Sequence, residues 1–325
     1  MQNMTSMENM RSMVKDIDVL CVGIAVADVF GKVIDELPEL GRLITFDHIE
    51  HHIGGCAVNT GIDLARLGAK VALVACVGND AAGDYIKKTL VSEGLDICGV
   101  ITNKDIASSY TFIMIDSNGN RRYLHHMGAN ARLTDQDVSD ELLDRARLLH
   151  IGGSFLMPSM DGEPTARLIK RAKSFGVITV IDTAYNKDVD SKKLIESSLD
   201  MVDVFLPSIE EAQLISGKQN REDVLAYFDK YNIPILGIKL GSQGCIIKHN
   251  GQIYKLPCFK VNVVDTSGAG DSFMAGFIYG YLHGWDVKKS ANFANAVAAH
   301  CIQAIGCYTG IPKAEKILTF LDCVK

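Results

Sequence analysis

The stretch Val264-Asp265-Thr266-Ser267-Gly268-Ala269-Gly270-Asp271-Ser272-Phe273 decides how this chain is interpreted. It joins a β-prone run, Gln252 to Val264, to a helix-forming run, Ser272 to His283, through a turn of small residues. N–H groups at a helix start lack internal acceptors and attract anions, and small residues let a phosphate approach them. The carboxylate of Asp271 would repel a phosphate, unless it takes a proton from an attacking hydroxyl while the turn holds the transferring phosphoryl group. The alternative is that Asp271 caps the helix and the glycines only form a tight turn.

Two signatures of the chain resemble those of the ribokinase-like (PfkB) family of carbohydrate and nucleoside kinases. Asp265 to Asp271 is similar to the family's D-T-x-G-A-G-D motif. Far upstream, Gly54-Gly55-Cys56-Ala57-Val58-Asn59-Thr60-Gly61 resembles the family's glycine pair with a nearby Asn, and Ala65-Arg66-Leu67-Gly68 follows it. The similarity runs from about Asp18 to Pro312. It implies a three-layer α/β/α sandwich with a mostly parallel central sheet and a small β-sheet lid.

The composition agrees with a soluble enzyme. A chain of 325 residues can bury one large α/β core and a small appendage. The hydrophobic content of 47% and the charged content of 22% are ordinary for a globular protein. A net charge of −6 argues against a general role on nucleic acid or on a membrane surface. No apolar run reaches the roughly 18–20 residues of a membrane span, so we expect a cytoplasmic protein without nucleic-acid or membrane partners.

The cysteines and the N-terminus also limit the interpretation. Nine cysteines without a C-x-x-C pair indicate reduced, mostly buried thiols rather than disulfides or a zinc site. Methionines recur every third residue from Met1 to Met13, without the apolar region of a signal peptide. We expect a mobile tail over residues 1–15, with a short amphipathic helix as the alternative, followed by a kinase domain over residues 16–325.

Strand-like and helix-like runs alternate along the chain, which predicts a parallel sheet covered by helices on both faces. The predicted strands are Asp18–Val22, Val71–Val77, Leu148–Ile151, Val177–Ile181, Val202–Leu206 and Ile235–Leu240. The predicted helices are Ala57–Leu67, Ala81–Glu93, Thr134–Arg147, Glu163–Phe175 and Val287–Cys301, besides the one that follows the turn.

Two segments, about residues 29–53 and 108–126, are strand-like where the rhythm predicts helices. Asn118-Gly119 in the second is a strong hairpin signal. In the family such segments form a lid over the sugar site and often a dimer contact, so the resemblance implies a homodimer through the lid. Five histidines lie in these segments: His48, His51, His52, His125 and His126. For them we favour polar lid contacts or plain solvent exposure over a metal site.

The resemblance places the acceptor at an Asp after the first strand and an Asn beside the glycine pair. Asp28 and Asn59 occupy these positions. A carboxylate accepts from sugar hydroxyls, and an amide both donates and accepts. Gly54 and Gly55 belong to the same site, and Gly55 would let the sugar approach the backbone. The alternative is that Asp28 caps a loop and Asn59 caps the following helix.

The resemblance also assigns the catalytic turn. Asp271 is the expected general base, and the N–H groups of Gly268, Ala269 and Gly270 are the expected anion hole for the γ-phosphoryl group. Asp265 resembles a position tied to a monovalent cation such as K⁺ in several relatives. A structural role of Asp265 in the turn is the alternative.

The nucleotide and its metal are expected on the other side of the turn. In Pro207-Ser208-Ile209-Glu210-Glu211-Ala212, Glu211 matches the Glu of the family's N-x-x-E motif, which organises Mg²⁺ and its waters, although Ser208 replaces the Asn. A charge that complements the helix dipole is the alternative for Glu211. The stretch Lys239-Leu240-Gly241-Ser242-Gln243-Gly244-Cys245 resembles the turn that covers the nucleotide, and its expected contacts are Lys239, Gly241 and Gly244. Asn295 falls where relatives approach the adenine.

These residues predict an ATP- and Mg²⁺-dependent kinase of a sugar or sugar derivative. The alternatives are a nucleoside kinase of the same fold and a non-catalytic sugar or nucleotide sensor. A Rossmann dehydrogenase fits poorly because no G-x-G-x-x-G follows the first strand, and no P-loop motif occurs.

Overall fold

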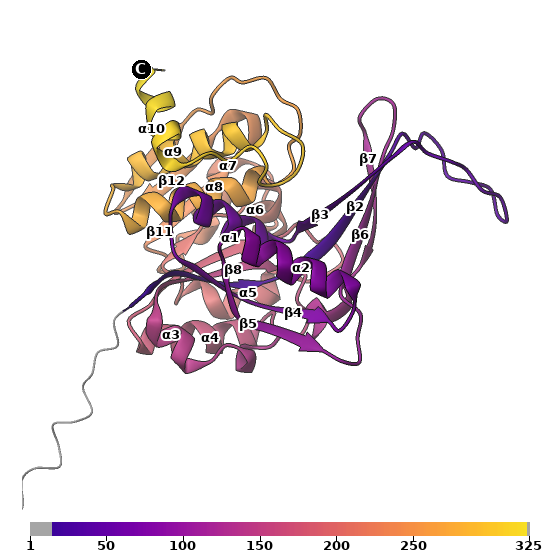
Figure 1. The fold of residues 1–325 in the computed structure, drawn as a ribbon. Helices are drawn as coiled ribbons and strands as arrows, with labels where there is room; N and C mark the ends of the chain where they lie inside the picture. Colours follow the sequence, from indigo (N-terminus) through magenta and orange to yellow (C-terminus); the bar gives the residue numbers. More distant parts are fainter. Residues whose placement is uncertain (1–14, 324–325) are drawn as a thin grey trace, which may run out of the picture.

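A nine-stranded sheet lies at the centre of the computed structural model, which describes residues 15–323 (Figure 1). Strands β12 and β13 at one edge run antiparallel, and the remaining pairs are parallel. In spatial order the strands are β13 (Gln252–Leu256), β12 (Cys245–His249), β11 (Ile235–Lys239), β10 (Val204–Phe205), β9 (Ile178–Thr183), β8 (Ala146–Ser154), β1 (Ile17–Gly23), β4 (Val71–Gly78) and β5 (Asp96–Asn103).

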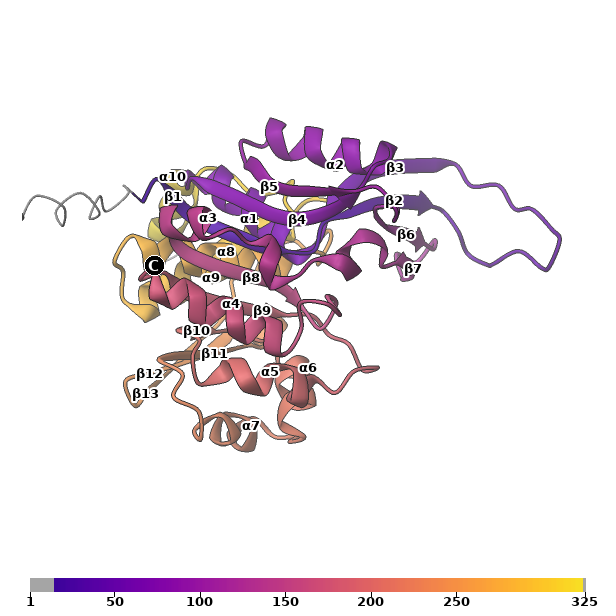
Figure 2. The same cartoon turned by 90° about the horizontal axis from the view of Figure 1, so that it is seen from below.

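Both faces of this sheet are covered by helices (Figure 2). Alternation along β1 shows why: Leu20 and Val22 enter one apolar core, and Val19 and Cys21 enter the other. The first core is closed by α3 (Asp140–Arg145), α4 (Glu163–Ser174), α5 (Ser191–Leu199), α6 (Ile209–Ser216) and α7 (Arg221–Phe228). The second is closed by α1 (Cys56–Leu67), α2 (Ala81–Ser92), α8 (Ala269–Leu282) and α9 (Val287–Cys301), and α10 (Ala314–Cys323) packs on α9. The predicted three-layer sandwich is confirmed.

The two strand-like segments together form a second, four-stranded sheet, the lid sheet. Its order is β3 (His48–Gly54), β2 (Val26–Lys32), β6 (Ser109–Ile115) and β7 (Arg121–His126). β2 pairs with β6 in parallel, whereas the outer pairs are antiparallel. The predicted hairpin joins β6 to β7 around Gly119, whose φ is 83°. The loop between β2 and β3 extends away from the body of the molecule (Figure 2).

Three predicted boundaries are wrong. The helix expected from Thr134 to Arg147 is divided into the short 3₁₀ helix η2 (Asp135–Asp137) and α3, because Thr134 caps η2 and Ser139 caps α3. Strand β13 ends at Leu256, before Pro257, which has no N–H to continue a ladder. Helix α8 begins at Ala269, inside the predicted turn. Two further 3₁₀ helices are η1 (Gly128–Arg132) and η3 (Gly241–Gln243).

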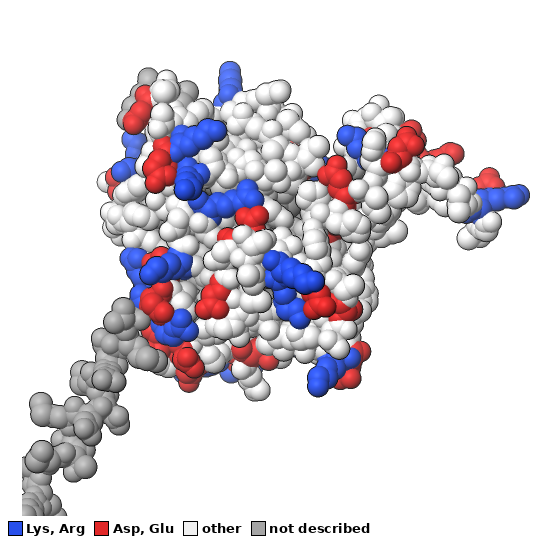
Figure 3. All heavy atoms as spheres, viewed as in Figure 1, with Lys and Arg blue, Asp and Glu red and all other residues white. Residues whose placement is uncertain are grey.

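Other expectations concern the tail, the thiols and the surface. Of the expected tail, residues 1–14 lie outside the described residues, and the Lys15 ammonium donates to the Ala146 carbonyl at 2.9 Å. Four of the nine cysteines are buried, three are partly buried and two are exposed. On the face drawn in Figure 3, basic and acidic side chains are interspersed. No helix within residues 15–323 is long and apolar enough to span a bilayer.

Candidate active site

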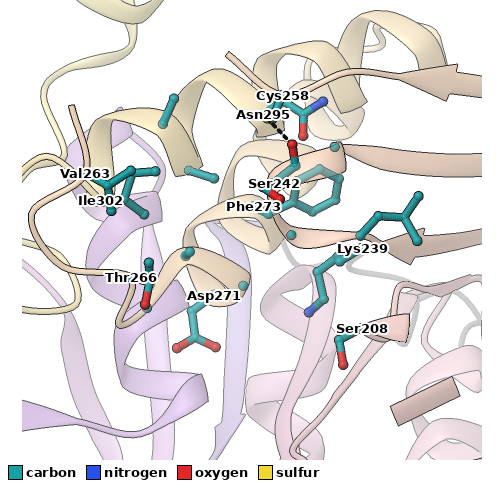
Figure 4. A pocket seen from close by; sticks show the side chains of 18 of the residues that line it. Ser208, Lys239, Ser242, Cys258, Val263, Thr266, Asp271, Phe273, Asn295 and Ile302 are labelled. Carbon is teal, nitrogen blue, oxygen red and sulfur yellow. Dashed lines mark hydrogen bonds between the residues drawn. The ribbon is translucent and has the colours of Figure 1, made fainter. Parts of the chain in front are cut away.

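A cavity of about 920 Å³ opens at the carboxyl ends of the central strands, where open α/β sheets place their ligands. One end is polar and is lined by Asp271, Lys239 and Ser208, whereas Val263 and Ile302 lie at the other (Figure 4). Of the predicted site residues, the cavity brings together Lys239, Gly241, Gly244, Asn295, Glu211, Gly268, Ala269, Gly270 and Asp271. Asp28, Gly54, Gly55, Asn59 and Asp265 lie outside its lining.

The turn before α8 presents backbone N–H groups to this cavity. Gly268 has a φ of 73° and a Cβ there would lie 2.5 Å from the Cys307 carbonyl oxygen, so the position requires glycine. The Ala269 N–H donates to the Thr266 carbonyl at 3.3 Å. Within residues 15–323 the N–H groups of Gly268 and Gly270 have no hydrogen-bond acceptor, which leaves them able to bind an anion. An added Cβ on Gly270 would make an ordinary contact of 3.5 Å with the Lys239 ammonium, so space alone does not require glycine here.

Asp271 lies in the first turn of α8, beside the amide of Asn59 on α1. The Asn59 Nδ2 donates to Asp271 Oδ2 at 2.7 Å. Gly268 is the N-cap of α8 and no side chain caps it, so the alternative that Asp271 is the N-cap is wrong. Burial and the nearby Asp182 carboxylate raise the pKa of Asp271 to about 7. Asn59 and Lys239 favour the ionised carboxylate and only partly offset this increase. A carboxyl group that titrates near neutrality suits a general base.

A buried ion pair adjoins Asp271. The Lys239 ammonium lies 2.8 Å from Asp182 Oδ1, and the two side chains are 12% and 2% exposed. Burial disfavours the charged ammonium, but the carboxylates of Asp182 and Glu211 outweigh it and raise the pKa of Lys239. The sequence analysis missed Asp182, although it directly follows a predicted strand at the carboxyl edge of the sheet.

Glu211 lies in the first turn of α6, where its carboxylate complements the helix dipole. It forms a capping box with Ser208 at the start of α6: its Oε2 accepts from the Ser208 N–H at 2.7 Å, and Ser208 caps the Glu211 N–H. Oε2 also accepts from the Thr183 hydroxyl at 2.8 Å. Glu211 nevertheless lines the cavity, and no residue in the described chain bonds its Oε1.

The carboxylates present here fit Mg²⁺. No cluster of three or more His, Cys, Asp or Glu within residues 15–323 could enclose a metal ion by itself. Mg²⁺ usually binds through one or two carboxylates, waters and substrate phosphates, so a protein cage is not needed. Glu211 and Asp182 are the carboxylates that line the cavity beside Lys239 and could hold the ion, Glu211 through water.

Asp28 projects from the lid sheet towards the glycine pair. A Cβ on Gly54 would lie 2.2 Å from Asp28 Oδ2, so this glycine makes room for the carboxylate. Burial raises the pKa of Asp28 to about 6, although the Thr111 hydroxyl and His52 each lower it. Gly55 has a φ of 102°, and a Cβ there would lie 2.3 Å from the Ile24 carbonyl oxygen. Backbone packing by itself therefore requires glycine at this position.

One row of polar side chains crosses the lid sheet beside Asp28. The strand register aligns Asp28 with His52 on β3 and with Thr111 on β6, and aligns Thr111 with His125 on β7. The Thr111 hydroxyl contacts the Asp28 carboxylate, and the His125 Nδ1 lies 3.1 Å from the same hydroxyl. Burial lowers the pKa of His125. His52 bonds Glu50 at 3.1 Å, so these two histidines make polar lid contacts as predicted.

Asp265 has a structural role in the turn. Its Oδ1 accepts from the Ser267 N–H at 2.8 Å, and its Oδ2 accepts from the Gly306 N–H at 3.0 Å. The Arg121 guanidinium from β7 lies 2.7 Å from Oδ1. Burial on its own would raise the pKa of Asp265. The hydrogen-bond donors and the Arg121 guanidinium outweigh this effect and hold the pKa below its ordinary value.

The remaining residues that we expect near a nucleotide line the far end of the cavity. Gly241 has a φ of 55° with open space around it, whereas a Cβ on Gly244 would lie 2.0 Å from the Leu256 carbonyl oxygen. The Asn295 amide donates to the Pro257 carbonyl at 3.1 Å, which fixes the chain after β13. The sequence analysis also missed Cys56, which lines the cavity together with Asp271. Its place after the glycine pair was the only signal.

Comparison with known proteins agrees with this architecture. The family profile of pfkB family carbohydrate kinases matches residues 16–314. A 5-dehydro-2-deoxygluconokinase of Clostridium tetani is 28% identical over 94% of this chain and 93% of its own. A nucleoside kinase of Methanothermobacter thermautotrophicus is 28% identical over 92% of this chain and 94% of its own. The Arabidopsis thaliana ribokinase solved with ribose and ATP has a TM-score of 0.84 at 25% identity, covering 95% of this chain and 99% of its own.

Proposed function

The chain belongs to the pfkB family of carbohydrate kinases, and from that premise we propose that residues 16–325 form one catalytic domain, which transfers the γ-phosphoryl group of Mg-ATP to a hydroxyl of a sugar or sugar derivative. Asp271 is the general base in this proposal. Asp28, Asn59 and the Gly54–Gly55 pair hold the acceptor.

The observation that carries the proposal is the position of Asp271. Its carboxyl group lies between the cavity and the Asn59 amide, which it contacts at 2.7 Å. An acceptor hydroxyl held by Asp28 and Asn59 would lie next to a base whose pKa is about 7. The base takes the hydroxyl proton as the oxygen attacks the γ-phosphorus, and ADP leaves on the opposite side. The Asn59 Oδ1, which is buried and unpartnered among the described residues, is the atom available to accept from a second hydroxyl.

The turn and the buried cluster supply charge stabilisation. The N–H groups of Gly268 and Gly270 face the transferring group, with a weaker contribution from Ala269, whose N–H already contacts Thr266. Lys239 places a cation at the polar end of the cavity. Mg²⁺, held through Glu211 and Asp182, neutralises phosphate charge when it is bound. Gly241, Gly244 and Asn295 line the rest of the ATP site in this proposal. Val263 and Ile302 would lie beside the adenine ring.

A nucleoside is the second candidate acceptor. Phe30 lies two residues after Asp28 on β2, hence on the same face of the lid sheet, and its ring packs edge-on against His52 at 5.2 Å. The Phe30 ring is only 5% exposed, so it offers little surface on which a nucleoside base could stack. Sequence identity does not distinguish the two classes of acceptor. The 5-dehydro-2-deoxygluconokinase and the nucleoside kinase are equally similar to this chain, each at 28% identity.

The test is ADP release from Mg-ATP across pentoses, hexoses, ketoses, sugar phosphates, sugar acids and nucleosides, with Asp271→Asn as the control. Turnover of one class that is lost in the variant supports the proposal and names the class. If ATP binds but no compound is turned over, the chain is a sensor rather than a kinase of these acceptors.

The lid also suggests the oligomeric state. Leu37, Leu40 and Leu43 in the loop between β2 and β3 are 60%, 104% and 82% exposed. Both outer strands of the lid sheet have an unpaired edge. Covering these edges and side chains with the lid of a second copy would make a homodimer. Sedimentation equilibrium of the wild type and of Leu40→Glu tests it: a dimer that the variant splits is expected, and a wild-type monomer would contradict it.

A further inference from the structure

Arg121 joins the lid sheet to the turn before α8. It is the first residue of β7, and its guanidinium reaches across to two residues of the turn. Nη2 lies 2.7 Å from Asp265 Oδ1, and Nη1 donates to the Ser267 hydroxyl. The Asp265 side chain is fully buried and that of Arg121 is 19% exposed, so water screens this pair little.

The same carboxylate shapes the turn. Asp265 accepts from the N–H groups of Ser267 and Gly306, so it fixes the backbone directly before Gly268. The free N–H groups of Gly268 and Gly270 follow within a few residues. The orientation of the anion hole therefore depends on a carboxylate that the lid holds through Arg121.

Arg121 is also connected, through the lid sheet, to the proposed acceptor site at Asp28. Arg121, Tyr123 and His125 alternate on one face of β7, and His125 is linked through Thr111 to Asp28. A lid that is ordered by an acceptor on Asp28 would thus also order Arg121 on Asp265. Acceptor binding and phosphoryl binding would be coupled through side chains that no signature motif includes.

We propose that Arg121 is a positioning residue that sets the anion hole from the lid and supplies the positive charge beside Asp265, so that catalysis needs no monovalent cation. The proposal rests on the kinase function proposed above. It replaces the K⁺ expected at Asp265 with a side chain of the protein. One guanidinium nitrogen of Arg121 contacts the Asp265 carboxylate and another donates to the Ser267 hydroxyl, so a single lid side chain holds two residues of the turn.

The kinetic test compares Arg121→Ala with Arg122→Ala. Arg122 is the matched control because it neighbours Arg121 on the opposite face of β7, is exposed, and donates to the Asp35 carbonyl at 3.5 Å. We expect Arg121→Ala to lower kcat about 10- to 100-fold, with partial rescue by added ethylguanidinium, and Arg122→Ala to stay within about twofold. Replacing K⁺ by tetramethylammonium at constant ionic strength should change the wild-type rate less than about twofold. A wild-type rate that requires K⁺, or an Arg121→Ala enzyme as fast as the control, would overturn the proposal.

Hydrogen exchange of the free proteins gives a readout that needs no turnover. Arg121→Ala should exchange faster both in the β6–β7 hairpin, residues 109–126, and in the turn, residues 264–272, whereas Arg122→Ala should change neither. Faster exchange in the lid alone would mean that Arg121 only anchors the lid, and would overturn its role in the turn. Faster exchange of both segments in Arg121→Ala, in a protein that turns over no acceptor, would support the role of Arg121 in the turn even though the kinase proposal had failed.

Discussion

The Asn59 amide donates to the Asp271 carboxylate at 2.7 Å, across 212 residues of sequence. Asn59 lies on α1, which follows the glycine pair, and Asp271 lies on α8, which follows the late turn. The Thr60 hydroxyl adds a contact to the Asp271 carbonyl at 3.3 Å. The residue expected to hold the acceptor therefore also orients the expected base, so the two signatures form one site.

Replacement of the base should separate chemistry from binding. Asp271→Asn keeps the shape and can still accept from Asn59, but it cannot take a proton. We expect kcat to fall about 10²- to 10⁴-fold while the Kd for ATP, measured by calorimetry, changes little. The exposed Asp105→Asn is the control and should keep the wild-type kcat. Near-normal turnover by Asp271→Asn would remove Asp271 from the role of base.

The pH dependence should report the same carboxyl group. A base works only when it is deprotonated, so kcat/KM should rise with pH and level off above the Asp271 pKa of about 7. The Asn59 hydrogen bond lowers this pKa, so Asn59→Ala should move the rise to higher pH. Thr60→Val is the control, because Thr60 bonds the backbone of Asp271 and not its carboxylate. A rise at the same pH in wild type and Asn59→Ala would contradict this assignment.

The Lys239–Asp182 pair should matter for stability as well as for ATP. Lys239→Met leaves the Asp182 carboxylate, 2% exposed, without its cation. Loss of one partner of a buried pair costs about 3–5 kcal/mol of unfolding free energy. Lys248→Met breaks the more exposed pair with Asp229 and should cost only about 0–1 kcal/mol. Urea unfolding measures both, and equal losses would mean that the buried pair is not special.

Asp63 provides a test of stability against pH. It lies fully buried on α1, accepts from the Ser272 hydroxyl, and burial holds its pKa well above the ordinary value. The folded chain therefore keeps a proton that the unfolded chain releases above about pH 4, so wild-type stability falls as pH rises. Asp63→Asn lacks this loss, and its stability relative to wild type should increase from pH 5 to pH 8.

The control for Asp63 has the opposite sign. Asp80 caps α2 and accepts from Gly83 and Ser108, and these hydrogen bonds outweigh burial and lower its pKa. Its stabilisation is present above about pH 4 and is lost as pH falls through the lowered pKa. Asp80→Asn should therefore be less stable than wild type at pH 7, with a deficit that shrinks in acid. Urea unfolding of both variants with the same trend would contradict the assignments.

Local pattern explains what the sequence could predict. The turn of small residues placed Gly268 to Asp271 at a helix start, and the Asn118-Gly119 pair predicted the lid hairpin, because both depend on neighbours in the chain. Asp182 could also have been found, since it directly follows a predicted parallel strand. Arg121 was not: its role depends on β6–β7 pairing and on how the lid sheet meets the turn, 144 residues away from Asp265. The Ile24 carbonyl that packs against Gly55 is brought there by the fold and not by a local pattern, so the sequence could not predict this second reason for the glycine.

The most direct test of the central claim follows the phosphoryl group itself. ATP labelled in the γ-phosphoryl group is incubated with Mg²⁺, the acceptor panel and either wild type or Asp271→Asn, and the products are separated. The account predicts label on a hydroxyl of one acceptor class with wild type, and at least about 100-fold less with the variant at equal ATP binding. Label that appears only as inorganic phosphate, or transfer by the variant at the wild-type rate, would contradict it.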